Sequence, residues 1–147
     1  MAVKAKPDGY HTVTPVVVFA GSAKFIDFAK QAFGAEELMR VPGPGGAIMH
    51  AEIKVGDSII MLSDPMRGET MTASLYLYVD NADTVFKRAV AAGATPDMEP
   101  TDMFWGDRMG SLKDPFGNHW TIATHKEDVA PEEMTKRMEA FMKQQHG

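Results

Sequence analysis

Apolar and polar positions follow the same order twice along this chain. In the first half, VTPVVVF at residues 13–19 predicts a strand, and AKFIDFAKQAF at 23–33 carries apolar side chains at helical spacing. Ser22 is a candidate cap for this helix, and Gly34 is expected to end it. Three further strands are predicted in ELMRV at 37–41, AIMHAEIKV at 47–55 and SIIMLSD at 58–64.

The second half repeats this order with different residues. The predicted elements are a strand in ASLYLYV, a helix in ADTVFKRAVAA capped by Asn81, a loop through Pro96 and Pro100, and strands near GSLKD and in HWTIATH. The glycines that end the two helices, Gly34 and Gly93, are 59 positions apart. A fixed spacing of this kind indicates an internal repeat.

The repeated order places the chain in the α+β class. We expect a single domain over residues 1–147, with βαβββ repeats at 13–66 and 72–125. Because each helix covers only one face of its curved mixed sheet, the two uncovered faces are expected to form a cleft. We therefore look for function in this cleft.

A third, C-terminal helix is predicted over residues 130–146. Pro131 suits the first helical turn, and the apolar residues of the segment form one stripe, which consists of Met134, Met138, Phe141 and Met142. Such a stripe needs a partner surface. The pattern leaves open whether that surface belongs to the same chain or to a second subunit.

Composition and charge narrow the functional classes. The formal net charge is -5 and the basic residues form no stripe, so we expect no nucleic-acid partner. With no cysteine, the chain has neither disulfides nor a thiolate nucleophile or metal ligand. The chain also has no long apolar run and no secretory signal, which favours a cytoplasmic protein without a membrane partner.

Five segments resemble the vicinal oxygen chelate (VOC) superfamily, which includes glyoxalases, bleomycin-resistance proteins and extradiol dioxygenases. These segments are HTVTPVVVF, IDFAKQAFGAEELMR, IMHAEIKVGDSIIMLSD, MFWGDRMGSLKDPFGNHW and TIATHKED. The resemblance covers residues 8–128, and the pair WGDR and DPFGN is closest to the PhnB-like branch. It implies the VOC fold of two repeats and a homodimer, but the fold alone names no reaction.

Metal-dependent members of the superfamily resemble one another in placing a ligand on the first and last strand of each repeat, usually His or Gln and then Glu. Matching this pattern onto the chain gives four positions, which are Thr14, Met61, Ser74 and Thr121. A shift by one residue would replace Met61 with Ile60. Hydroxyl and thioether groups are poor ligands for a divalent ion. The departure from the family pattern therefore predicts a cleft without the usual metal and without a cofactor.

Strand alternation places Tyr76 and Tyr78 on the same face as Ser74. The loop FWGDR resembles a pocket lid. The alternative is a structural pair of Arg108 with Asp107, with Trp105 filling either the seam between the repeats or a dimer contact. The predicted ligand-binding residues are Thr14, Met61, Ser74, Tyr76, Tyr78, Trp105, Arg108 and Thr121.

Three residues are candidate acid-base or catalytic groups. His50 and Glu52 lie two apart on one strand face, either as a general base and its partner or as a solvated edge. His119 shares a face with Thr121 and is a further candidate, whereas His11 and His125 carry less weight.

The leading hypothesis is a glyoxalase- or bleomycin-resistance-like protein that binds a small, partly apolar organic molecule in the inter-repeat cleft without a metal. The alternative is a metal-dependent lyase, isomerase or glyoxalase-type enzyme whose centre has moved to His50, Glu52 and His119. A third interpretation is a role in subunit association, in which the C-terminal helix and the FWGDR lid serve only a dimer. Whether any reaction is catalysed stays open.

Overall fold

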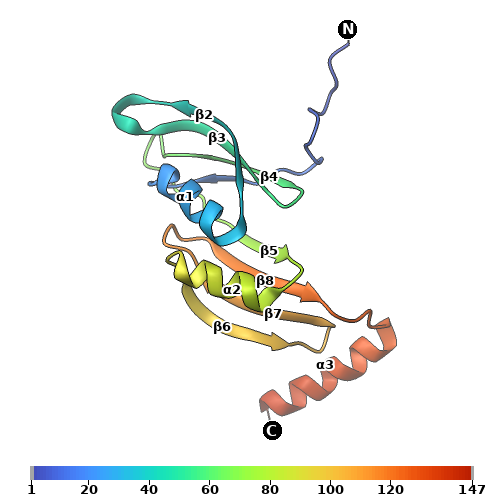
Figure 1. The fold of residues 1–147 in the computed structure, drawn as a ribbon. Helices are drawn as coiled ribbons and strands as arrows, with labels where there is room; N and C mark the ends of the chain where they lie inside the picture. The colour runs from blue at the N-terminus through green and yellow to red at the C-terminus, as the bar shows by residue number, and fades with distance from the viewer. Residues whose placement is uncertain (1, 147) are drawn as a thin grey trace.

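The computed structural model describes residues 2–146, which form two four-stranded mixed sheets and three α-helices (Figure 1). The first sheet contains β1 (Val16–Val18), β2 (Glu36–Pro42), β3 (Ile48–Val55) and β4 (Ser58–Ser63). The second contains β5 (Ser74–Tyr78), β6 (Thr95–Asp102), β7 (Asp107–Lys113) and β8 (His119–His125). The helices are α1 (Ser22–Phe33), α2 (Ala82–Ala91) and α3 (Pro131–His146), and a short 3₁₀ turn η1 (Pro44–Gly46) joins β2 to β3.

The two sheets have the same strand order, which confirms the fold expected from the repeated pattern. The orders are β1-β4-β3-β2 and β5-β8-β7-β6, and in each sheet the first strand pairs with the last in parallel. Val16 lies opposite Met61 in the first sheet, and Tyr76 lies opposite Thr121 in the second. The chain therefore builds one βαβββ unit twice with the same register.

The start of α1 differs from the expectation that Ser22 caps it. Gly21 occupies the cap position, and the Ser22 hydroxyl donates to the carbonyl oxygen of Phe19 instead. The amides at the start of α1 have their acceptor in the residue that follows β4. The Asp64 carboxylate accepts hydrogen bonds from the amides of Gly21 and Ser22. Asp64 also accepts from the amide of Ile48, so one carboxylate joins α1, β3 and the end of β4.

The start of α2 uses the equivalent position of the second repeat. The hydroxyl of Thr124 accepts a hydrogen bond from the amide of Ala82 and donates to the carbonyl oxygen of Val79. Asn81 caps the helix, as expected, because its side-chain oxygen accepts from the amide of Thr84. The Thr124 hydroxyl therefore accepts from an amide at the start of α2, as the Asp64 carboxylate accepts from amides at the start of α1.

The segment between α2 and β7 was expected to be a loop because it holds Pro96 and Pro100, and this expectation was wrong. It forms β6, which pairs only with β7 and has breaks in its register around Met98. Proline has no amide hydrogen to donate, and an edge strand with bulges tolerates that loss. The proline spacing was therefore compatible with an edge strand.

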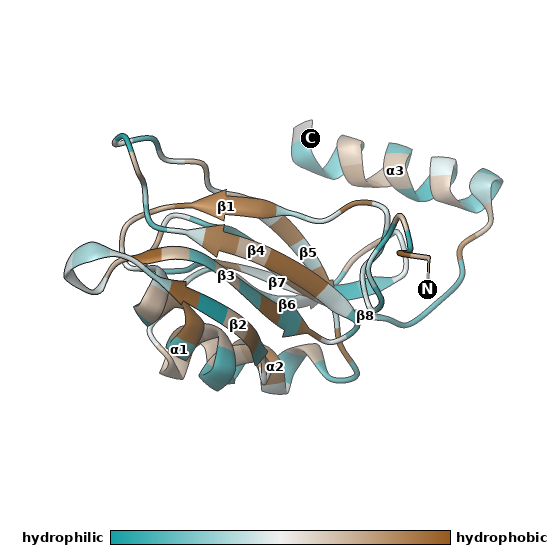
Figure 2. Ribbon diagram, turned by 90° about the horizontal axis from the view of Figure 1, so that it is seen from above, coloured by the Kyte–Doolittle hydropathy of each residue, from teal (hydrophilic) through white to brown (hydrophobic). Residues whose placement is uncertain are grey.

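α1 and α2 lie side by side against the same side of the two sheets (Figure 2). Aromatic side chains join the repeats: the ring of Phe116 stacks on that of Phe19 at 5.6 Å, and the rings of Phe33 and Trp120 lie 4.5 Å apart. The guanidinium of Arg88 also donates to the carbonyl oxygen of Gln31 across the two helices. The two repeats therefore share one core, and the other face of each sheet, which we call its open face, is left uncovered by these helices.

α3 forms over the predicted residues and packs on its own chain at few points. The ring of Phe141 lies 5.3 Å from that of Phe104, and Arg137 binds both carboxylate oxygens of Glu127. Met138 and Met142 remain about half exposed. The apolar stripe is thus only partly used within the chain. No described helix is long and apolar enough to span a membrane.

Candidate functional site

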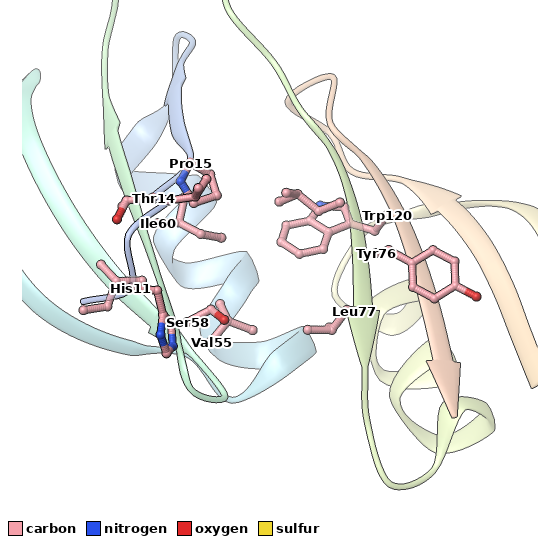
Figure 3. Close-up of a pocket in the computed structure, with 12 residues that line it drawn as sticks. His11, Thr14, Pro15, Val55, Ser58, Ile60, Tyr76, Leu77 and Trp120 are labelled. Atoms are coloured by element: carbon pink, nitrogen blue, oxygen red, sulfur yellow. The ribbon is translucent and has the colours of Figure 1, made fainter. Parts of the chain in front are cut away.

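A pocket of about 240 Å³ lies between the two repeats (Figure 3). Apolar side chains of both repeats form its walls, among them Val55 and Ile60 from the first repeat and Leu75, Leu77 and Trp120 from the second. Trp120 is almost fully buried, and its indole N–H is fixed by the carboxylate of Asp114 at 2.9 Å. We call this the inter-repeat pocket, and it offers apolar contact surface on a rigid core.

The rim of the inter-repeat pocket is polar. His11, Thr14 and Ser58 lie on the side of the first repeat, where the N-terminal segment passes the turn between β3 and β4. His11 Nε2 lies 3.0 Å from the carbonyl oxygen of Asp57, which fastens the segment to that turn. Tyr76 contributes to the opposite wall, but its hydroxyl points away from the pocket (Figure 3).

A second hollow, of about 510 Å³, lies under the N-terminal segment on the open face of the first sheet. It contains Thr14, Met61 and Glu52, and it shares His11 and Thr14 with the inter-repeat pocket. Glu52 is buried and its carboxylate lies 2.8 Å from Nε2 of His50, so the two residues share a face as the alternation predicts. Polar chemistry is therefore available beside the apolar pocket.

The four positions where the family carries metal ligands do not suit a metal here. Thr14 and Met61 line the hollow of the first repeat, whereas Ser74 and Thr121 lie on β5 and β8 of the second. The first repeat offers one hydroxyl and one thioether at these positions, and the second offers two hydroxyls. Neither pair supplies the imidazole and carboxylate donors that hold a divalent ion. The side chains that occupy these positions do not fit the family's metal centre.

The relocated centre proposed from sequence is not assembled within one chain. His119 lies on β8, where its Nε2 is 3.8 Å from a carboxylate oxygen of Asp97. His50 and Glu52 bind each other on β3 of the other sheet. Between residues 2 and 146, no group of three His, Asp or Glu side chains is placed to hold one ion.

A polar network that sequence reasoning did not assemble lies on the second sheet. Asp107 is buried, and its Oδ2 accepts hydrogen bonds from the hydroxyls of Tyr76 at 2.6 Å and Tyr78 at 2.9 Å. Its other oxygen lies 2.8 Å from Nδ1 of His125, whose Nε2 lies 2.7 Å from Asp128. We call Tyr76, Tyr78, Asp107 and His125 the tyrosine–aspartate cluster.

The cluster shifts the pKa of each member in a direction set by these contacts. Burial, and then the hydrogen bond to Asp107, raise the pKa of Tyr76 to about 12, and the same bond raises that of Tyr78. Burial acts to raise the pKa of Asp107, but its three hydrogen bonds together outweigh burial and lower it. Hydrogen bonds to Asp107 and then Asp128 raise the pKa of His125. At neutral pH the tyrosines are therefore donors to a carboxylate anion.

The loop before β7 holds Trp105 beside this cluster. The indole N–H of Trp105 donates to the hydroxyl of Tyr76 at 3.3 Å, and its ring lies edge-on to that of Phe104. Gly106 has a positive φ of 101°, and a Cβ there would collide with the backbone of Glu127. The glycine thus lets the chain after β8 approach closely, which brings His125 and Asp128 to Asp107.

The side chain of Arg108 lies on the face of β7 opposite to that of Asp107. Its guanidinium binds the carboxylate of Asp83 at the start of α2 and that of Asp102 on β6. The alternative pairing of Arg108 with Asp107 is wrong, because neighbouring residues of a strand point to opposite faces. That alternation was readable in the sequence and would have separated Asp107 from Arg108. The partnership with His125 had no comparable signal, because it depends on how β7 and β8 pair.

Comparison with known proteins decides the family. A family model described as the Glyoxalase/Bleomycin resistance protein/Dioxygenase superfamily matches residues 12–122. This chain belongs to that superfamily. Its members include VOC proteins, as the resemblance implied, and the PhnB-like branch is among its structural neighbours. Membership of the superfamily establishes the fold. It does not identify a ligand or a reaction, which must be argued from the residues of the site.

Relatives and solved structures agree with this assignment. An uncharacterized protein of Mycobacterium bovis is 35% identical over 94% of this chain and 96% of its own length. The crystal structure of TioX from Micromonospora sp. ML1 superimposes with a TM-score of 0.67 at 25% identity, covering 78% of this chain and 98% of that one. The PhnB protein of Bacillus cereus gives a TM-score of 0.63 at 22% identity, over 78% of this chain and 99% of that one. The last likeness concerns the fold alone.

Proposed function

We propose that this superfamily member binds a small, partly apolar organic molecule in the inter-repeat pocket without a metal. The observation that carries the proposal is the pocket itself, which is lined by apolar side chains of both repeats. An apolar cavity of about 150 Å³ is enough to bind benzene in an engineered protein, so about 240 Å³ suits a one- or two-ring molecule. The polar rim at His11 and Ser58 would orient a substituent of the ligand.

The test is a change of melting temperature with a neutral two-ring aromatic such as indole. A ligand that binds only the folded chain raises its stability by mass action, by roughly 4 °C at ten times Kd. Substitution Leu77→Trp fills the pocket and should abolish the rise. Val3→Trp is the control, because Val3 is 95% exposed and outside the pocket, and it should keep the rise. An equal rise in both variants would contradict the proposal.

The metal-dependent alternative has its own test. The protein is dialysed against Ni²⁺, Zn²⁺, Mn²⁺ or Mg²⁺, loosely held ions are removed, and bound metal is measured. We expect no stoichiometric ion, because neither the family positions nor His50, Glu52 and His119 assemble a suitable donor set. One ion per chain that is lost on His50→Ala would support the metal-dependent enzyme instead.

We also propose that the chain forms a homodimer in which α3 contributes to the interface. Superfamily members often dimerise, and within the chain α3 leaves Met138 and Met142 about half exposed. Its charges favour a second, antiparallel copy of itself, since Glu132 and Glu133 lie at its start and Lys143 near its end.

A further inference from the structure

The tyrosine–aspartate cluster presents aromatic rings over a buried negative charge. The rings of Tyr76 and Tyr78 lie 5.2 Å apart, and these residues are 45% and 60% exposed on the open face of the second sheet. Both hydroxyls are tied to Asp107, which is 3% exposed. The hydroxyls are therefore occupied, and what the tyrosines offer to a ligand is the faces of their rings.

This arrangement favours a cation over a neutral or anionic ligand. The face of an aromatic ring carries negative potential, and a phenol that donates to a carboxylate is richer in electrons than a free one. An open hollow of about 380 Å³ lies beside Tyr78 and His125 and is also lined by Asp80. A cation in this hollow would meet the ring of Tyr78 and the carboxylate of Asp80, and the Tyr78 hydroxyl ties that ring to the carboxylate of Asp107.

Of the nearby basic side chains, Arg108 is engaged elsewhere, because it binds Asp83 and Asp102 on the helix side of β7. Lys126 lines a hollow that also contains Asp107. The imidazole of His125 is held between Asp107 and Asp128. With Asp80 and Asp128 counted beside the cluster, three carboxylates face the cations of His125 and Lys126, so these surroundings stay net negative even when His125 is protonated.

We propose that the tyrosine–aspartate cluster, with Asp80 beside it, is a binding site for a small alkylammonium cation, in which Tyr78 supplies the ring face, the ring of Tyr76 flanks it, and Asp80 and Asp107 supply the charge. The site is separate from the inter-repeat pocket. The two share only Tyr76, whose ring points away from that pocket (Figure 3). Quaternary and methylated ammonium groups are the ligands that such aromatic surfaces hold best.

The experiment compares choline with 3,3-dimethylbutan-1-ol, which has the same shape but no charge, by isothermal titration calorimetry. We expect choline to bind about two- to fivefold more tightly, the ratio that a cation–π contact at an exposed site gives. Affinity for choline should also fall when sodium chloride is raised, because salt screens the attraction to the carboxylates. Equal affinities for the two compounds, or no binding of choline, would overturn the proposal.

Variants locate the site on the sheet. Tyr78→Leu removes the more exposed ring and should weaken choline binding about two- to fivefold, whereas Tyr78→Phe keeps the ring and should weaken it less. Tyr10→Leu is the matched control, because Tyr10 belongs to the N-terminal segment and lines the hollow on the first sheet, so its loss should leave affinity unchanged. Wild-type affinity in folded Tyr78→Leu would contradict the assignment. Leu77→Trp should leave choline binding intact, so failure of this proposal and failure of the inter-repeat pocket are distinguishable.

Discussion

Single carboxylates tie the elements of each repeat together, and Asp64 shows this most clearly. Its two oxygens satisfy three backbone amides, those of Gly21, Ser22 and Ile48. Asp64→Ala would leave all three without a partner at a half-buried position, and each lost bond to a charged acceptor costs on the order of 1 kcal/mol or more. We expect a loss of about 3 kcal/mol in the free energy of unfolding, measured with urea.

The comparison variant is Asp64→Asn, which keeps one acceptor oxygen and should lose about half as much. Thr124→Val probes the equivalent position of the second repeat and removes a single amide partner, so it should cost about 1 kcal/mol. If Asp64→Ala were no more destabilising than Thr124→Val, the role assigned to the carboxylate would be wrong.

His125 makes stability depend on pH in a defined direction. Hydrogen bonds to Asp107 and then Asp128 raise its pKa above the ordinary histidine value of about 6.5, so protonation of the imidazole stabilises the folded chain. That stabilisation is fully present below the unfolded pKa of about 6.5 and is lost as pH rises through the folded pKa. The unfolding free energy of the wild type should therefore exceed that of His125→Gln by more at about pH 5.5 than at about pH 9. A difference that grows towards alkaline pH would contradict this reading.

The residues of the candidate site show what a sequence can and cannot reveal. Alternation along β3 and β5 correctly placed His50 with Glu52 and Tyr76 with Tyr78, because side-chain direction in a strand follows a period of two. The same period should have separated Arg108 from Asp107. Contacts between different strands could not be predicted from the sequence. His125 contacts Asp107 because β7 and β8 pair in a register that places these two residues opposite each other.

At the scale of elements, α3 is held mainly by one aromatic contact and one charged residue. Phe141 packs on Phe104, and Arg137 binds Glu127 and the carbonyl oxygen of Phe104. Phe141→Ala removes an aromatic pair whose coupling is worth about 1 kcal/mol, so amides of α3 should exchange with solvent roughly fivefold faster while those of α1 are unaffected. Lys136→Ala, an exposed change on the same helix, should leave the exchange rates as they are. Unchanged exchange in Phe141→Ala would mean that α3 is held by other contacts.

Element boundaries were predictable where local chemistry decides them. Gly34 ends α1 in a left-handed conformation, Asn81 caps α2, and Pro131 starts α3, each as the sequence indicated. Two elements were not predicted correctly because their partners are distant in sequence. β6 exists despite two prolines since only one of its edges pairs, and the start of α1 depends on Asp64 rather than on Ser22.

The assembly of the whole molecule can be tested through α3. If α3 joins two copies, replacing both exposed methionines by glutamate in Met138→Glu/Met142→Glu should convert the homodimer to monomers, because like charges would face each other across the interface. Sedimentation velocity measures the change. Met66→Glu is the control, since Met66 is similarly exposed but lies in the loop between β4 and β5. A wild-type chain that sediments as a monomer would rule out the homodimer.

The arrangement of the two repeats was predictable only in part. The internal period predicted two equivalent sheets, and the sheets have the same strand order. The position of the pocket was not readable in the sequence, because it depends on α1 and α2 packing together on one side and on where the edges of β1 and β5 then lie. Of the predicted ligand-binding residues, Thr14 and Tyr76 line the inter-repeat pocket, and most of its apolar wall was predicted only as core.

The chain has two tryptophans, and they allow the central proposal to be tested directly. Trp105→Phe leaves Trp120 as the single fluorophore, and Trp120 lines the inter-repeat pocket. The measurement is a titration of this variant with bromobenzene, whose heavy atom quenches indole fluorescence on contact, in buffer that contains EDTA. If the site is apolar and needs no metal, quenching should saturate as bromobenzene is added. Benzene, which lacks the heavy atom, should reverse the quenching by competing for the same site. Quenching that rises without saturation, or saturates only after a divalent metal is added, would contradict the account.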